Sequence, residues 1–434
     1  MKLIKSLALG ALALAVASVA SAATLKITGS SAFRKALYDS ILASGYTKAA
    51  YVGSSLNGSN QAAFFNGTDY IQTCIAGSVG GVNWVANNIN AGTSPTASKA
   101  ISWINPTGGA AWATPTIGAA PTYTITGGTQ LATSQSSAPL ATWEGAGVGA
   151  GALADVTMSD SYQDSTAYSA AATGQTLTDV LGGVGVVPFV FAKGLKHASV
   201  PQASYDRFTN VSALAFQNLA ANGVAPLSTF TGNSADAGID VVLTGRDNDS
   251  GTRLATNFET GFGNVDTYMF QYQPFAGATD AGTGTGLTIN SFTAFNLGTG
   301  QAGYASGGSV KNVLLNAVTG NSPNGNPYII LGYLGEGDSP TAGVLAGVGS
   351  AGQELKYNGQ TYGSDLYAVQ NANYTFWTVE HMYYRSSLST AKQTVAGTIA
   401  TALKSTYATA YASGILLPSM NCSRSSEGTV VSPN

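Results

Sequence analysis

An apolar run, a polar turn and the start of a helix follow one another at residues 239–258, an order typical of folds that alternate strands with helices. The run 239–243 is rich in β-branched residues and predicts a buried strand. Residues 245–253 then read GRDNDSGTR, in which Ser250 is a natural N-cap for the following helix. Because the first turn of a helix carries unpaired N–H groups and the positive end of the dipole, this turn is suited to an anion.

The side chains of this turn fit the same interpretation. Arg246 offers a planar fork of donors that matches a phosphate-like oxyanion, and Arg253 adds a second positive charge. Gly251 lets the backbone approach a ligand closely, between Ser250 and Thr252. Taken alone, the stretch is explained equally well as a capped turn without any ligand, because short motifs often match by chance.

The same order recurs near the beginning of the chain. Residues 24–28 alternate like a strand, residues 29–31 form a Gly-Ser-Ser turn, and Phe33, Leu37 and Ile41 lie on one face of a predicted helix. We interpret this as a second strand–turn–helix unit that can hold an anion. The alternative is an ordinary capped first helix of an α/β domain.

The motif Arg246-x-x-x-Ser250-Gly251-Thr252 resembles the phosphate-contacting loop of periplasmic phosphate-binding proteins, the soluble receptors of ABC phosphate importers. The resemblance implies an α/β, two-lobed, type II periplasmic-binding-protein-like fold with the anion in the cleft. Lobe 1 is then expected to contain residues 23–183 and 336–434, with an insertion at about 75–150. Residues 184–335 are expected to form lobe 2, and the run 182–191 to cross between the lobes.

The resemblance also assigns the first turn to the ligand, through its backbone and hydroxyl groups. It implies a role for Ser30 or Ser31 and for the backbone of Phe33. Ala32 stands where the family often has threonine, so both serines remain candidates.

A third turn follows a predicted strand at residues 49–52. The family places a ligand-facing serine here, and Ser59, just before a helix expected at residues 61–65, is the first choice. Ser55 is the second choice, and simple N-capping is the alternative for either serine.

Residues 154–160 predict a strand that ends in Ser-Asp, as in the family at this point of the chain. The resemblance makes Asp160 the carboxylate that accepts the proton of phosphate. Phosphate keeps a proton near neutral pH and sulfate does not, so an acceptor-only carboxylate favours phosphate. A turn-capping role is the alternative for Asp160. Asn248 replaces an aspartate that usually braces the arginine, which leaves other tetrahedral oxyanions open.

Residues 1–22 predict a secretory signal peptide, with a basic start, an apolar middle and Ala20-Ser21-Ala22 as cleavage site. The apolar stretch is too short for a membrane anchor, so we expect no membrane insertion after cleavage. The expected location is periplasmic or secreted. In an oxidising compartment Cys74 and Cys422 can form a disulfide, and two separate thiols are the alternative.

Charged residues form only 9% of the chain, against about 25% in an average soluble domain. The net charge of −3 gives no electrostatic footprint for nucleic acid. No cofactor is expected, and two histidines and two cysteines far apart argue against a zinc site.

Gly/Thr-rich regions at about 75–150 and 276–327 are expected to be β-rich insertions. The first of them holds Trp84, Trp103, Trp112 and Trp143.

The resemblance implies a non-enzymatic receptor for inorganic phosphate or a related oxyanion, with an ABC transporter permease as an expected partner. The alternative is a secreted or surface interaction protein that uses the tryptophan-bearing insertion. A secreted phosphatase ranks third, because no nucleophile–base pair is visible. Glu380 and His381 are adjacent in a predicted strand and therefore point to opposite faces. The tail from Ser423 is expected to be mobile.

Overall fold

The computed structural model describes residues 24–88, 101, 103–104, 112–118, 124–131, 153–264, 266–295, 302–338, 353–362, 366–405 and 414–434. The predicted signal peptide at residues 1–22 lies outside these residues, as does Trp143. The described chain has a mixed α/β fold built on one large sheet, as the sequence predicts. None of its described helices is both long and apolar enough to cross a membrane.

Eleven strands of the large sheet lie side by side, in mixed parallel and antiparallel pairing. In spatial order they are β12 (Val224–Pro226), β13 (Asp240–Leu243), β19 (Tyr328–Gly335), β10 (Gly185–Lys196), β21 (Trp377–Arg385), β8 (Val156–Ser159), β1 (Thr24–Gly29), β4 (Tyr70–Cys74), β3 (Gln61–Phe65), β2 (Lys48–Val52) and β7 (Thr129–Leu131). Off this row, β9 (Leu177–Asp179) pairs with β21, and β20 (Gln353–Tyr357) pairs with β10 and β11 (Asn210–Val211).

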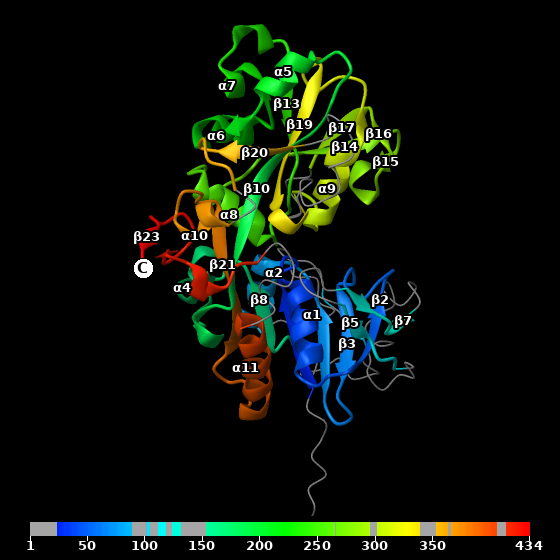
Figure 1. Cartoon of the computed structure of the whole chain (residues 1–434), viewed down its shortest axis with the longest axis vertical. Helices are drawn as coiled ribbons and strands as arrows, with labels where there is room; N and C mark the ends of the chain where they lie inside the picture. The colour runs from blue at the N-terminus through cyan, green and yellow to red at the C-terminus, as the bar shows by residue number, and fades with distance from the viewer. Residues whose placement is uncertain are drawn as a thin grey trace, which may run out of the picture.

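Strand β10 connects two groups of elements, which lie above and below it in Figure 1. Its first residues, Gly185–Pro188, pair with β21, whereas Phe189–Lys196 pair with β19. Its residues from Gly185 to Gly194 are buried, because both edges of the strand are paired and both faces are covered. The apolar run predicted at 182–191 is therefore a buried strand shared by both groups.

The lower group in Figure 1 contains the early strands, covered by helices that include α1 (Arg34–Ala43), α2 (Ser78–Ala86) and α11 (Thr390–Ser405). Strands β1, β4 and β8 are parallel neighbours, so their carboxyl ends meet at one edge of the sheet. The helix α2 packs on β1 and β8. It begins four residues after β4 and belongs to this layered core. The prediction that residues 75–86 are part of an insertion is therefore wrong.

The upper group contains β13, β19 and most of the remaining helices and small sheets. The helices are α5 (Gln202–Arg207), α6 (Ala213–Asn222), α7 (Ser228–Thr231), α8 (Gly251–Glu259) and α9 (Gly307–Leu315), while α4 (Ala170–Thr173) and α10 (Tyr367–Gln370) lie elsewhere. Its small sheets are β15–β14–β17 (Thr279–Asp280, Tyr272–Ala276, Ser291–Ala294) and β16–β18 (Thr288–Ile289, Ala317–Val318). Two further small sheets lie outside this group: β5–β6 (Thr116–Ile117, Ile125–Thr126) in the lower group, and β22–β23 (Cys422–Ser423, Ser432–Pro433) near the C-terminus.

Two expectations about secondary structure and mobility are wrong. Residues 61–65 form the strand β3 instead of a helix, because β2 and β4 flank this segment and bury its three central residues. The tail after Ser423 is packed: β22 pairs with β23, and Arg424 and Glu427 are buried. The Arg424 guanidinium donates to Glu259 at the end of α8 and lies over the ring of Trp377.

The two cysteines are not joined by a disulfide, contrary to the favoured expectation. Cys74 ends β4 within the large sheet, whereas the Cys422 Sγ atom lies 3.4 Å from the backbone oxygen of Gln370. Both side chains are buried, each in its own surroundings.

The described tryptophans of the predicted insertion contribute to packing. Trp84 and Trp103 are fully buried in one apolar cluster with Leu177 and Tyr383. Trp112 is half-buried, and its ring lies against that of Phe65. Trp84 and Trp103 therefore offer no exposed aromatic surface, whereas the half-buried ring of Trp112 packs with those of Phe65 and Tyr70.

Candidate functional site

A small pocket lies where four segments of the chain meet, and in this conformation it is too narrow to hold a water molecule. These segments are the turn after β1, the N-terminus of α2, the residue after β8 and the turn before α8. Its lining residues are Ser31, Gly77, Ser78, Asp160, Arg246, Ser250, Gly251 and Thr252. Six of these eight were singled out from the sequence, so residues as far apart as 31 and 252 converge on one hollow.

The turn before α8 has the predicted conformation. Ser250 has extended backbone angles, and its hydroxyl accepts a hydrogen bond of 3.3 Å from the N–H of Arg253, which confirms it as the N-cap. The N–H groups of Gly251 and Thr252 precede the hydrogen-bonded ladder of the helix. They are carried by residues of the cavity wall, so the positive end of α8 is directed at the hollow.

Backbone carbonyls orient the side chain of Arg246, which is only 4% exposed. Its Nε donates to the oxygen of Tyr304 at 3.3 Å, and its Nη2 donates to the oxygen of Ala305 at 3.1 Å. The sequence raised the question of what braces this arginine when position 248 is asparagine. Two carbonyl oxygens brace Arg246, and because they carry no full negative charge they leave its positive charge available for an anion.

Arg253 does not line the cavity, although the sequence suggested it as a second positive charge there. Its Nη1 donates to the backbone oxygens of Arg246 and Ala302, at 3.1 and 2.9 Å. Gln271 donates to the same two oxygens. Arg253 therefore fixes the backbone of the turn, and Arg246 is the cation of the cavity wall.

Asp160 lies directly against the N-terminus of α8. A Cβ atom at position 251 would overlap the Asp160 carboxyl group, so only glycine allows this approach. Burial raises the pKa of Asp160, while a hydrogen bond with the Ser78 side chain and the charge of Arg246 lower it. Its Oδ1 atom is buried without a hydrogen-bond partner among the described residues. Asp160 therefore contributes this carboxyl oxygen to the region of the cavity wall.

Ser78 and Gly77 were missed from the sequence, which proposed Ser59 for the corresponding turn. The Oγ of Ser59 donates to the oxygen of Gln61 and stays within its own turn, away from the cavity. Gly77, with a φ of 103°, and Ser78 follow β4 and start α2. The sequence shows the same order of strand, glycine, serine and helix at residues 70–86 as at the other two turns. It was not recognised because residues 75–150 were assigned to an insertion.

Two other predicted residues lie near the cavity without lining it. The Oγ of Ser30 donates to the Oε2 of Glu380 at 3.1 Å, so Ser31 is the serine of this turn that reaches the hollow. Phe33 is buried at the N-cap of α1, and its carbonyl accepts from the N–H of Leu37.

The two walls of the cavity also touch through backbone groups. The oxygen of Asp249 accepts hydrogen bonds from the N–H groups of Val79 and Gly80, at 2.9 and 3.3 Å. The turn before α8 thus caps the first turn of α2. This contact, together with that between Gly251 and Asp160, encloses the hollow from both groups of elements.

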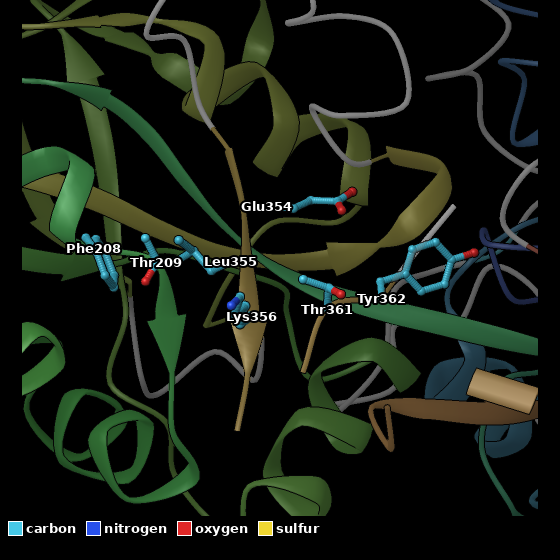
Figure 2. A pocket seen from close by; sticks show the side chains of 7 residues that line it. All are labelled: Phe208, Thr209, Glu354, Leu355, Lys356, Thr361 and Tyr362. Carbon is cyan, nitrogen blue, oxygen red and sulfur yellow. The ribbon is translucent and has the colours of Figure 1, made fainter. Parts of the chain in front are cut away.

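A larger hollow of about 200 Å³ lies along β20, between Phe208 and Tyr362 (Figure 2). Phe208 and Thr209 lie at one end of it, and Glu354 and Tyr362 at the other. Lys356 and Thr361 are exposed. Because its polar side chains are spread along the strand and do not converge, the smaller cavity is the better candidate for a specific site.

No protein-family model and no curated protein sequence matches the chain. The fold is similar to a candidate phosphate ABC transporter substrate-binding protein from Clostridium perfringens, solved with bound phosphate. The TM-score is 0.43 and the identity 11%, over 91% of this chain and 99% of that one. It is also similar to PstS from Borrelia burgdorferi, with a TM-score of 0.36 and 10% identity over 87% and 92% of the two chains.

A third similar structure is an ABC-type phosphate transport receptor from Vibrio cholerae. Its TM-score is 0.33 and its identity 12%, over 58% of this chain and 75% of that one. All of these TM-scores lie below 0.5, so the function proposed below is derived from the residues of this chain.

Proposed function

We propose that this protein captures inorganic phosphate, or a closely related tetrahedral oxyanion, in the cavity between α2 and α8. The observation that carries the proposal is the composition of the cavity wall. One buried guanidinium, the first turn of α8 and the hydroxyl-bearing residues Ser31, Ser78 and Thr252 surround this narrow pocket. Charge-assisted hydrogen bonds from such donors are the means by which proteins hold small oxyanions.

Asp160 supplies the selectivity in this proposal. A buried carboxylate oxygen without a donor repels an anion that carries no proton, and it accepts a hydrogen bond from one that does. Phosphate and arsenate keep a proton at neutral pH, whereas sulfate does not. Phosphate is therefore the preferred guest.

The protein acts as a solute receptor in this proposal, without turnover of its ligand. The two groups of elements joined by β10 act as two lobes in this proposal, with β20 in the group of residues 184–335 because it pairs with β10 and β11. Closure of the lobes around the anion presents a shape that an ABC transporter permease recognises. The expected signal peptide places the protein in the periplasm or outside the cell.

Isothermal titration of the purified protein with phosphate, arsenate and sulfate tests the proposal. We expect saturable one-to-one binding of phosphate and arsenate, and much weaker binding of sulfate. Bound phosphate should also raise the unfolding temperature, because a ligand of the native state stabilises that state. Absence of both effects for all three anions would contradict the proposal, and hydrolysis of a phosphoester would favour an enzyme instead.

Replacement of Asp160 by asparagine should shift the preference of the cavity toward sulfate. The amide can donate to an unprotonated oxyanion, and the negative charge that repels sulfate is gone. A hydrogen bond to a charged group contributes about 1.5–3 kcal/mol, so the ratio of phosphate to sulfate affinity should fall about 10- to 150-fold.

Asp164→Asn is the matched control for this variant, because Asp164 lies in the same segment but is exposed. It should keep the preference of the wild type in the same titrations. An unchanged ratio of phosphate to sulfate affinity in Asp160→Asn would show that another group accepts the hydrogen bond from the protonated anion.

A further inference from the structure

Glu380 is a second carboxyl group at the back of the cavity wall. The register between β21 and β8 pairs His381 with Ser159, so the next pair places Glu380 opposite Asp160. Residues directly opposite each other on antiparallel strands point to the same face. Glu380 thus faces the cavity side of the sheet with its side chain fully buried. His381 points to the other face, where its Nδ1 lies 2.8 Å from the Oδ2 of Asp179.

One oxygen of Glu380 is connected to the turn that lines the cavity. The Oγ of Ser30 donates to Glu380 Oε2 at 3.1 Å and accepts from the N–H of Ala32 at 3.2 Å. Ser31, the residue between them, lines the hollow. The other oxygen, Oε1, is buried without a hydrogen-bond partner in the described part of the chain.

The charges around Glu380 disfavour its ionised form. Asp160 faces it from the end of β8, and Arg246 is directed at Asp160 from the turn before α8. The covering helix α2 and the paired segment Gly185–Pro188 of β10 carry no titratable side chain. On the opposite face of β21 lie His381 and its surroundings, which are Asp179, Tyr162, Tyr383 and Glu427.

Burial first, and the charge of Asp160 second, raise the pKa of Glu380 well above its usual range, and the hydrogen bond from Ser30 opposes this shift. None of the described cationic side chains forms an ion pair with Glu380. A buried carboxylate in such a place is costly, whereas a protonated carboxyl group is not.

We infer that Glu380 must carry a proton for the cavity to hold its anion, so that its ionisation releases the guest. The inference rests on the proposed phosphate site and adds a regulatory residue to it. With Glu380 neutral, Asp160 and Arg246 are the charged side chains among the residues that line the pocket, and Asp247 and Asp249 lie buried in the adjoining turn. Ionisation of Glu380 adds a further negative charge behind Asp160, and a dianion is repelled. Glu380 acts through this field and through Ser30, without touching the anion.

Phosphate titrations between about pH 8 and about pH 10 test the inference, because phosphate remains a dianion over this range. Above the pKa of Glu380 in the free protein, the dissociation constant of the wild type should rise about tenfold per pH unit. Binding in that range should also take up a proton, which titrations in two buffers of different ionisation enthalpy measure. In Glu380→Gln both the steep rise and the proton uptake should disappear, because the amide stays neutral.

Two further variants sharpen the test. Ser30→Ala removes the hydrogen bond that favours ionised Glu380, so the loss of binding should move to higher pH; an unmoved or lower midpoint would contradict the inference. His381→Gln alters the neighbouring titratable group on the opposite face of β21 and should keep the wild-type profile. A Glu380→Gln profile parallel to that of the wild type would overturn the inference. If the wild type binds no phosphate at any pH, the proposed function itself fails.

Discussion

Arg246→Ala is expected to abolish most of the affinity for phosphate. The variant removes the cation of the cavity wall and leaves Asp160 without its positive neighbour. Loss of one partner of a buried, hydrogen-bonded charge pair costs about 2–5 kcal/mol, which corresponds to a fall in affinity of about 30- to 5,000-fold. Isothermal titration at neutral pH measures this effect directly.

Two further variants distinguish the effects of charge, of side-chain geometry and of nonspecific destabilisation on phosphate affinity. Arg246→Lys keeps the charge but not the planar fork, so its affinity should lie between those of the wild type and the alanine variant. Arg34→Ala removes a half-buried arginine close to Ser31 that does not line the cavity, and it should bind phosphate almost as the wild type does. Wild-type affinity in Arg246→Ala, with a normal unfolding temperature, would eliminate this cavity as the anion site.

Gly251→Ala is expected to weaken phosphate binding without harming the helix that carries it. Alanine is the better helix former, but its Cβ would overlap the Asp160 carboxyl group. The two walls must then separate or shift, and overpacking of this kind costs about 1–3 kcal/mol. Phosphate affinity should therefore fall about 5- to 150-fold.

The loss of phosphate affinity should depend on where the added methyl group lies, and a Gly→Ala substitution in another helix should not cause it. Gly397→Ala in α11 is the matched control, because a Cβ there meets no atom within 4 Å. It should leave phosphate affinity unchanged and leave the unfolding temperature equal or slightly raised. Small-angle scattering with saturating phosphate should show a larger radius of gyration for Gly251→Ala than for the wild type. Equal affinity and equal size would show that the contact with Asp160 is dispensable.

Local sequence was sufficient wherever neighbouring residues decide the conformation. The strand β13, the cap at Ser250 and the start of α8 follow from a β-branched run, a hydroxyl side chain and a helical pattern within about twenty residues. The strand–turn–helix unit of β1 and α1 follows in the same way. These units also supplied Ser31, Arg246, Ser250, Gly251 and Thr252 as candidate residues.

Local patterns failed where a distant partner decides the outcome. Residues 61–65 have the composition of a helix start, yet the pairing with β2 and β4 makes them a strand. Arg253 has the charge of a ligand-binding residue, yet it donates to the carbonyl oxygens of Arg246 in its own turn and of Ala302 in a distant segment, and it does not line the cavity. Burial and charges from other segments also determine the protonation of Glu380.

The sequence by itself determined which short segments can present N–H groups, hydroxyl groups and a guanidinium to an anion. Only the tertiary structure decided which of these segments meet. The order of strands in the large sheet brings the ends of β1, β4 and β8 to one edge, and this selects Ser78 over Ser59. It also places Asp160 against Gly251. The physical reason is that the pairing of strands far apart in the chain fixes which turns are neighbours, and no local pattern encodes that pairing.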